Sequence, residues 1–196
     1  MAIIVDKQQK KRDIALAAKE LILGYGVNNI TVSQIAKSAN IGKGTVYEYF
    51  KNKDEIVFEL VEIMMSEHNL KKEQRLKELS STREKIKSFF SFFYTDEDAQ
   101  LREIYKQFTA IALANTDPKI IFFQRECYVL YVKWMEDIID EGITNQELKS
   151  ESRELIMGIF AFAQGSFIMN ITADMGEDLK LKIDRQIDLL FDLIER

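Results

Sequence analysis

The residues best suited to chemistry lie close together in residues 41–50, which read IGKGTVYEYF. Two glycines leave backbone N–H groups uncovered, and Lys43 adds a positive charge between them. Uncovered N–H groups at a helix start bind phosphate oxygens, because the donors and the helix dipole act together. Thr45, Tyr47 and Tyr49 follow with hydroxyl groups that could reach phosphates or base edges, although each tyrosine could instead pack against a neighbouring helix. The segment therefore predicts a phosphate-binding helix start.

The scarcity of cysteine and histidine excludes several other kinds of site. One cysteine, Cys127, and one histidine, His68, cannot build a disulfide framework or a zinc site with several soft ligands. We interpret them as a buried thiol and a surface imidazole. An enzyme that uses an apolar pocket is an alternative, but no nucleophile-and-base pair, glycine-rich phosphate loop or metal cluster is recognisable. The sequence predicts no catalytic residue, no metal and no cofactor, and hence no enzyme.

The first residues and the cysteine usage bear on location. The start, MAIIVD, lacks the cationic region and the long apolar core of a signal peptide. A single cysteine fits a reducing compartment. We expect a cytoplasmic protein.

Charge is unevenly distributed along the 196 residues. The chain has a net charge of −5, yet residues 1–53 hold nine Lys or Arg against four Asp or Glu, which gives +5 and leaves −10 for the rest. This asymmetry indicates that the first fifty residues meet a polyanion, while the acidic remainder has another task.

The helical periodicity predicts an all-α fold. One proline and eight glycines interrupt the chain, and this scarcity favours long helices, about nine in number. Apolar residues of 14–25 recur at helical spacing, and Gly26 is placed to end that helix in a left-handed conformation. Thr31 and Gln34 form a capping-box pattern before a short helix, and Asn40 suits the left-handed backbone of a tight turn. Two short helices joined by such a turn form a helix-turn-helix.

Two further patterns orient the second of these helices and begin the next one. Val46 and Phe50 are spaced to face inward from the second short helix. Asn52 and Glu55 form another capping pattern, which starts a long helix that continues through Ile63.

Residues 14–55, in particular GVNNITVSQIAKSANIGKGTVYEYFKNKDEI, resemble the DNA-binding domain of the tetracycline-repressor (TetR/AcrR) family of bacterial transcription regulators. The glycine after the first helix, the threonine that opens the second, the Lys-Gly-Thr triplet and the aromatic ending carry this resemblance. It implies that the following residues contact DNA, mostly its backbone: Thr31, Lys43, Gly44, Thr45, Tyr47, Tyr49 and Lys53.

Three features leave alternatives open. Gly42 stands where many members have a hydroxyl residue, so that phosphate contact is either missing or supplied by a backbone N–H. Glu48 is acidic where basic, histidine or aromatic residues are common, and it could accept from a cytosine amino group or point away from the duplex. The basic run at residues 7–12 is either an arm over phosphates or a solvated, frayed helix end.

Beyond the long helix, the residues themselves carry the interpretation. Asp117 and Pro118 begin a helix that runs to Gly142 and that we expect to be buried on two sides. Eleven of the thirteen phenylalanines lie after residue 80. Aromatic residues at helical spacing are usually core, yet helices packed around them also leave apolar pockets. The resemblance implies a small-molecule effector, and we predict that its pocket is lined by Phe89, Phe93, Tyr105, Phe108, Tyr128 and Trp134.

The last two helices show a pattern typical of helix association. Residues 155–173 hold no charged side chain, which is near the length of a membrane span, but polar residues and the absence of interfacial anchors favour a helix buried on several sides. Small residues on this helix and a wide apolar face on the final helix exceed what one chain can cover. The resemblance implies a homodimer, and we predict an interface of Gly158, Ala161, Gly165, Ile183, Ile187, Leu190, Phe191 and Ile194.

Together these patterns predict a helix-turn-helix DNA-binding domain at residues 1–53 and a helical ligand-binding and dimerisation domain at residues 54–196. The expected function is a ligand-responsive transcriptional regulator, most often a repressor in this family, that binds a near-palindromic double-stranded operator as a dimer and is released by a small, largely apolar effector, without a membrane partner. Two-fold symmetry would set two recognition helices roughly 34 to 36 Å apart. The alternative is a helical small-molecule-binding or interaction protein that has lost specific DNA binding.

Overall fold

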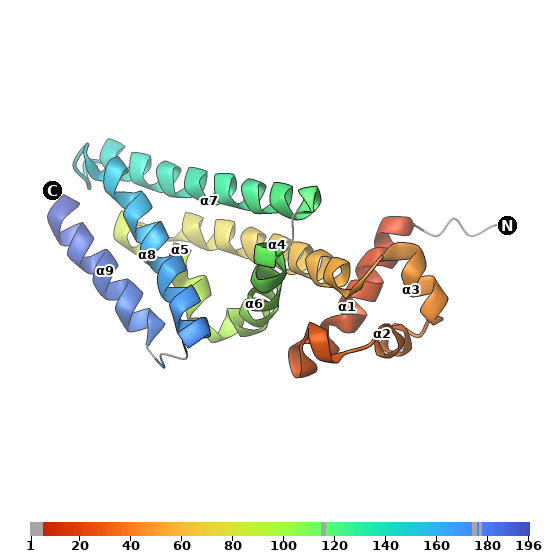
Figure 1. The fold of residues 1–196 in the computed structure, drawn as a ribbon. Coiled ribbons are helices and arrows are strands. Elements are labelled where there is room, and N and C mark those ends of the chain that lie inside the picture. Colours follow the sequence, from red (N-terminus) through yellow and green to blue (C-terminus); the bar gives the residue numbers. More distant parts are fainter. Residues whose placement is uncertain (1–5, 115–116, 174–175, 177) are drawn as a thin grey trace. The chain divides into compact units, whose positions relative to one another are not determined.

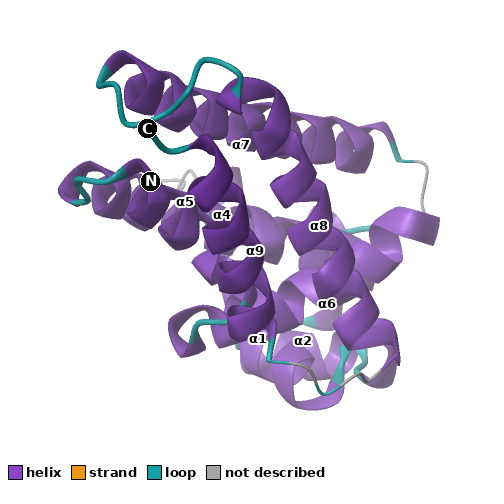
Figure 2. Ribbon diagram, turned by 90° about the vertical axis from the view of Figure 1, so that its left-hand side faces the viewer, coloured by secondary structure: helices purple, strands orange, loops and turns teal. Residues whose placement is uncertain are grey.

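A computed structural model of the chain describes residues 6–114, 117–173, 176 and 178–196. All regular elements of these residues are helical, as Figure 2 shows, which confirms the predicted all-α class. The α-helices are α1 (Lys7–Tyr25), α2 (Val32–Ser38), α3 (Lys43–Tyr49), α4 (Lys53–Glu78), α5 (Thr82–Phe90), α6 (Ala99–Ala114), α7 (Pro118–Thr144), α8 (Ser152–Ala173) and α9 (Leu179–Ile194). Three 3₁₀ turns join them: η1 (Val27–Asn29), η2 (Ser91–Phe93) and η3 (Asp96–Asp98).

The chain forms two compact units. The first contains residues 1–68 and 100–120, and the second contains residues 69–99 and 121–196. The helices of the predicted DNA-binding domain, α1 to α3, lie in the first unit together with the first part of α4 and nearly all of α6. The boundaries between the two units fall within α4, α6 and α7.

Local sequence signals set the helix boundaries of the first unit. The Thr31 hydroxyl accepts from the Gln34 main-chain N–H at 3.2 Å, and the Gln34 side chain accepts from the Thr31 N–H at 2.8 Å, which completes the predicted capping box. Asn40 has a φ of 53° in the turn between α2 and α3, as predicted. Gly26 ends α1 with the expected positive φ of 76°, but its ψ of 150° lies outside the left-handed helical region.

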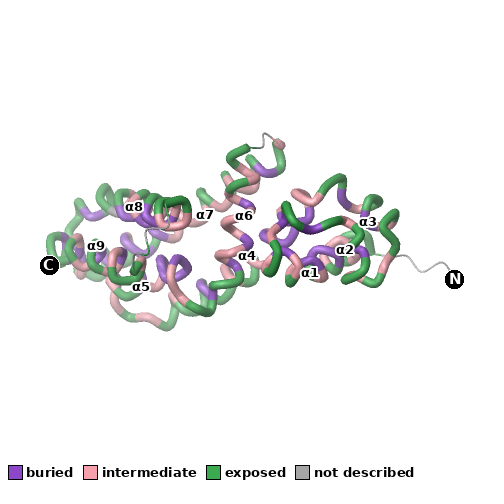
Figure 3. The backbone as a smooth tube through the Cα atoms, turned by 60° about the horizontal axis from the view of Figure 1, so that its bottom comes forward, coloured by how far each residue is buried: buried purple, intermediate pink, exposed green. Residues whose placement is uncertain are grey.

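The core of the first unit is built from the inward faces of α1, α2, α3, α4 and α6. The helices α1, α2 and α3 pack on one another, and Figure 3 shows their buried faces. The α6 face that joins this core ends at Phe108, whose ring lies 6.2 Å from that of Phe58 on α4. The buried apolar residues include Ile14, Ala18, Ile22, Ile35, Ala36, Val46, Phe50, Ile56, Val57, Leu60, Leu101, Ile104 and Phe108.

In the second unit α9 packs against both α5 and α8, as Figure 1 shows. Arg83 on α5 fixes this packing, because its guanidinium forms ion pairs with Asp192 at 2.8 Å and Glu195 at 2.6 Å and lies 5.6 Å from the Phe191 ring centre. The apolar face of α9 is therefore turned into the unit.

Several expected burial patterns are wrong in this chain. The first half of α7 is not buried on two sides, since Ile121 and Tyr128 are 47% and 52% exposed. Cys127 and His68 are both half-buried rather than fully inside or at the surface. The helix α8 is long and apolar enough, by length and composition, to cross a membrane, and much of one side of it is exposed rather than buried.

Candidate DNA-binding surface and effector domain

The helix α3 presents its polar residues outward on a buried anchor. Val46 and Phe50 are each 1% exposed, so the predicted inward face is confirmed. Tyr47 is 51% exposed, and Thr45 and Tyr49 are half-buried. Because two apolar side chains hold this short helix, its outward side chains are presented on a fixed support.

The start of α3 is open. Gly42 stands at the N-cap with no side-chain hydrogen bond, and Lys43 and Gly44 are exposed in the first turn. A Cβ added at Gly44 would meet no atom within 4 Å, so the backbone here is accessible. Glu48 is exposed on the same helix.

Two other residues predicted to contact DNA are engaged by the protein itself. Thr31 is exposed, but its side chain caps α2. The Lys53 ammonium donates to the main-chain oxygens of Ile30 at 2.8 Å and Asn28 at 3.3 Å. Lys53 thus fastens the beginning of α4 to the segment that leads into α2.

The basic run at residues 7–12 forms the first turns of α1 rather than a separate arm. Asp6 caps this helix by accepting from the N–H groups of the first turn. Lys11 pairs with Glu59 on α4 at 2.7 Å and lies 5.1 Å from the Phe50 ring centre, while Arg12 pairs with Glu67 at 2.6 Å. Two of the four cations therefore hold α1 to α4 and cover the anchor of α3.

Glu59 was not singled out from the sequence, although it is only 5% exposed. Its one available signal is its place within a mostly apolar stretch of α4, residues 56–65, in which Glu62 is the other charged residue. Burial, and next to it the charge of Glu59, raise the pKa of the nearby Glu62 carboxyl. The Lys11 ammonium partly offsets this effect.

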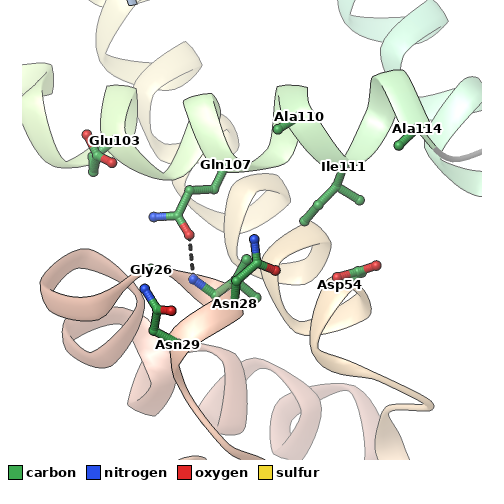
Figure 4. A pocket seen from close by; sticks show the side chains of 10 residues that line it. Gly26, Asn28, Asn29, Asp54, Glu103, Gln107, Ala110, Ile111 and Ala114 are labelled. Carbon is green, nitrogen blue, oxygen red and sulfur yellow. Dashed lines mark hydrogen bonds between the residues drawn. The ribbon is translucent and has the colours of Figure 1, made fainter.

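A groove of about 540 Å³ lies in the first unit between η1, the start of α4, and α6 (Figure 4). Gln107 projects from α6 toward η1, where its side-chain oxygen accepts from the Val27 N–H at 2.7 Å and its side-chain nitrogen donates to the Ile22 oxygen at 3.2 Å. Asp54 and Glu103 lie on different walls, and Ala110, Ile111 and Ala114 form the apolar part. One α6 side chain thus holds the end of α1.

The six residues predicted to line an effector pocket fall into both units. Tyr105 and Phe108 belong to the first, where their rings are 6.3 Å apart and Phe108 is fully buried. Phe89, Phe93, Tyr128 and Trp134 belong to the second.

In the second unit these rings are linked through other aromatic residues. Phe89 meets Tyr131 edge-on at 6.0 Å, and Tyr131 is 6.0 Å from Trp134. Phe93 lies 5.3 Å from Phe167. Tyr131, which the prediction omitted, therefore connects two of the predicted residues.

The predicted dimer interface needs correction on α9. Ile183, Ile187, Phe191 and Ile194 are at most 4% exposed, because α5 and α8 of the same chain cover them, and Leu190 is half-buried. The four buried residues are part of the core. The exposed apolar side chains of α9 are instead Leu181, Leu189 and Leu193.

The predicted residues of α8 do face outward. Gly158, Ala161 and Gly165 are all exposed, and a Cβ added at either glycine would meet no atom within 4 Å. Leu155 and Met169 on the same helix are 46% and 55% exposed. The small size of Gly158, Ala161 and Gly165 therefore serves no packing within the described part of the chain.

Comparisons with known proteins agree with this architecture. Residues 14–60 match the model of the family described as bacterial regulatory proteins, tetR family. The fatty acid metabolism regulator protein of Bacillus subtilis (strain 168) is 28% identical over 193 residues, which cover 94% of this chain and 95% of that protein.

Two solved structures extend the likeness over nearly the whole chain. FadR from Bacillus subtilis in complex with stearoyl-CoA has a TM-score of 0.62 at 28% identity, covering 91% of this chain and 96% of that one. A transcriptional regulator from Saccharomonospora viridis in complex with choline has a TM-score of 0.78 over 96% of this chain and 98% of that one, and at 17% identity it shows the fold alone. With its helix-turn-helix, its helical second unit and these relatives, the chain is a DNA-binding transcriptional regulator whose residues 14–60 match the tetR family of bacterial regulatory proteins.

Proposed function

We propose that this protein is a repressor that binds a near-palindromic operator as a homodimer and releases it when an effector with a long acyl chain binds. The observation that carries the effector class is the 28% identity, over 94% of the chain, to a fatty acid metabolism regulator. The structure of FadR from Bacillus subtilis, which is also 28% identical to this chain, has been solved in complex with stearoyl-CoA. The proposed site of action is the cytoplasm, with no catalytic role and no insertion into a membrane.

The DNA contacts are proposed for the outward side of α3. Lys43, Gly44, Thr45, Tyr47 and Tyr49 stand on a helix whose two apolar residues are buried, which supports a direct contact with phosphates or base edges. Thr31 adds a contact at the start of α2. Lys53 contributes chiefly by positioning the start of α4 against the segment before α2, because its ammonium already donates hydrogen bonds to two main-chain oxygens.

The effector is proposed to bind the aromatic side chains of the second unit. Phe89, Phe93, Tyr128 and Trp134 from the sequence prediction, with Tyr131 added, offer ring faces and edges suited to an apolar chain. Tyr105 and Phe108 belong to the first unit, where Phe108 is fully buried, and they are left out of the proposed site. Since α4 runs through both units, a shift of α4 on binding would alter the DNA-binding helices, provided that the effector has different affinities for the two states.

The homodimer is proposed to form through the outward faces of α8 and α9. The exposed face of α8 supports this choice, since Gly158, Ala161 and Gly165 allow another helix to approach closely. Leu181, Leu189 and Leu193 take the place of the four buried residues of α9 in this interface. A second copy of the chain also accounts for the apolar character of α8 without a membrane.

A gel-shift assay with DNA that flanks the gene of this protein tests the proposal. The wild type should form a sequence-preferring complex at low salt, and oleoyl-CoA, but not CoA alone, should dissociate it. The double variant Thr45→Ala/Tyr47→Ala should bind about tenfold more weakly, because it removes two of the proposed DNA contacts. Tyr25→Ala is the matched control, since Tyr25 is a 63% exposed tyrosine at the end of α1.

Two results would count against the proposal. A folded dimer that forms no sequence-preferring complex would contradict operator binding. Equal DNA affinity of the wild type and the double variant would favour the alternative, a helical interaction protein that has lost specific DNA binding.

A further inference from the structure

A buried lysine stands among the aromatic residues of the second unit. Lys72, near the end of α4, is only 8% exposed. Its ammonium lies 4.6 Å from the ring centre of Phe89 on α5 and 5.6 Å from that of Tyr131 on α7. Three helices thus surround one positive charge. Sequence reasoning missed it because Lys72 sits in a polar stretch that reads as a solvated helix face.

The ammonium has few hydrogen-bond acceptors. It donates to the main-chain oxygen of Phe89 at 2.8 Å, and no carboxylate of the described residues forms an ion pair with it. The Tyr131 hydroxyl donates to the Asn69 side-chain oxygen at 3.0 Å. A lysine ammonium has three N–H bonds, so one acceptor and two ring faces leave it under-coordinated for a buried cation.

Keeping this charge inside the protein is costly. Burial lowers the Lys72 pKa to about 8, although the charge of Asp98 on η3 acts in the opposite direction; the positive charge of Arg75 on α4 lowers the pKa further. A methionine of similar length would fill the same space without that cost, because a buried charge is favourable only when it is paired. A costly and incompletely coordinated cation next to a proposed binding region indicates a ligand.

We propose that the Lys72 ammonium anchors the effector by donating a hydrogen bond to the carbonyl oxygen at the head of its acyl chain. Phe89 and Tyr131 then flank the first carbons of that chain. The inference rests on the proposed function and deepens it, since it names the polar group that the site recognises. A free carboxylate and a thioester both supply such an oxygen, and each completes the coordination of the ammonium.

Binding can be followed with the single tryptophan of the chain, Trp134, whose ring lies 6.0 Å from that of Tyr131. The probes are oleate, oleoyl-CoA, oleyl alcohol, which lacks the carbonyl, and CoA alone. Lys72→Met keeps the apolar stem and removes the donors. Lys71→Met is the matched control, because the side chain of Lys71 is 70% exposed and pairs only at the surface with Glu97.

The wild type and Lys71→Met should bind oleate, oleoyl-CoA or both at least about tenfold more tightly than oleyl alcohol, as a charged hydrogen bond predicts. In Lys72→Met that preference should disappear, while the affinity for the alcohol stays within about twofold, which also shows that the variant is folded. Preference for oleate identifies a carboxylate head, and preference for oleoyl-CoA identifies a thioester.

The anchor and the proposed function fail in different ways. An unchanged preference for the acyl probes in Lys72→Met, or equal binding of alcohol and acyl probes by the wild type, overturns the anchor. If Lys72→Met no longer binds oleyl alcohol either, the test passes to Lys72→Gln, which keeps two N–H donors. That variant must retain the preference for the acyl probes, and loss of the preference in Lys72→Gln also overturns the anchor. Failure of every probe to release wild-type protein from its operator would instead overturn the proposed effector class, whatever Lys72→Met does.

Discussion

The side-chain oxygen of Gln107 on α6 lies 2.7 Å from the Val27 main-chain nitrogen, although the two residues are 80 positions apart in the chain. The same side chain donates to Ile22, the residue whose carbonyl also accepts from the Gly26 N–H at the end of α1. Val27 is 5% exposed, so water cannot easily replace the amide. Gln107 therefore decides how the end of α1 is held.

Replacing this residue should loosen that junction. We expect Gln107→Ala to lower the free energy of unfolding by roughly 1–3 kcal/mol, because a buried N–H loses its acceptor. Urea unfolding followed by circular dichroism measures it. Gln100→Ala, an exposed glutamine on the same helix, should change stability by less than about 0.5 kcal/mol. Equal effects of the two variants would show that the Val27 contact contributes nothing.

The pair of Lys11 and Glu59 should behave as a coupled unit. Lys11→Met leaves the nearly buried Glu59 carboxylate without its partner, and we expect a loss of roughly 1–3 kcal/mol, below the range for fully buried pairs because the Lys11 side chain is 29% exposed. The double variant Lys11→Met/Glu59→Leu should recover more than half of that loss. A double-mutant cycle by urea unfolding tests this, and strictly additive effects would contradict coupling.

A substitution on the exposed face of α8 should weaken the dimer without lowering the stability of the single chain. Gly165→Leu adds a side chain where no atom lies within 4 Å, so it should not destabilise the single chain, and its helix propensity is better by up to about 1 kcal/mol. It should nevertheless weaken the dimer by at least about tenfold, because the partner helix can no longer approach. Sedimentation equilibrium measures the change. Gly24→Leu, also on an open helix surface, should leave the dimer intact.

The buried ammonium of Lys72 predicts a specific pH dependence. Its pKa is about 8 in the folded protein and 10.5 when exposed, so the unfolded chain binds more protons between these values and stability rises with pH across that window. The difference in unfolding free energy between wild type and Lys72→Met should shift in favour of the wild type by roughly 2 kcal/mol from pH 7 to pH 10. The contributions of other titrating groups cancel in that difference, because both proteins contain them. A difference in unfolding free energy that stays constant from pH 7 to pH 10 would contradict the lowered pKa of Lys72.

Glu48 offers a test on the DNA side. Its carboxylate is exposed on α3, so near a duplex it should repel phosphates. We expect Glu48→Gln to strengthen binding to operator and unrelated DNA alike, by about threefold at low salt, with a smaller effect at high salt. Fluorescence anisotropy with both duplexes measures this. If discrimination at one G·C pair falls instead, Glu48 reads a cytosine amino group.

The sequence predicted those features that depend on residues close along the chain. The Thr31 and Gln34 capping box, the left-handed Asn40, the Asn52 cap of α4 and the Asp117 cap of α7 are all present. Each is a hydrogen bond or a backbone preference within four residues, so the local pattern is sufficient to specify it. The inward side of α3 was predictable for the same reason.

Contacts between distant segments were not predictable in this way. Lys53 was predicted to contact DNA, and Lys11 belonged either to an arm over phosphates or to a solvated helix end. In the structure Lys11 pairs with Glu59, and the Lys53 ammonium donates to main-chain oxygens. The apolar stripe of α9 was correctly recognised as a buried face, but the sequence could not tell whether its own chain or a second copy covers it. Arg83 and the packing of α5 turned it inward.

By itself the sequence determined that the chain is helical, that it carries a helix-turn-helix, and which residues of that motif point away from its core, because helical periodicity and capping act over one or two turns. Only the tertiary structure decided that Gln107 holds the end of α1, that Glu59 and Lys72 are buried, and that Leu181, Leu189 and Leu193 are the exposed apolar residues of α9. A side chain's burial and its partners depend on helices far away in the sequence, and a periodic pattern specifies a face without specifying what covers it.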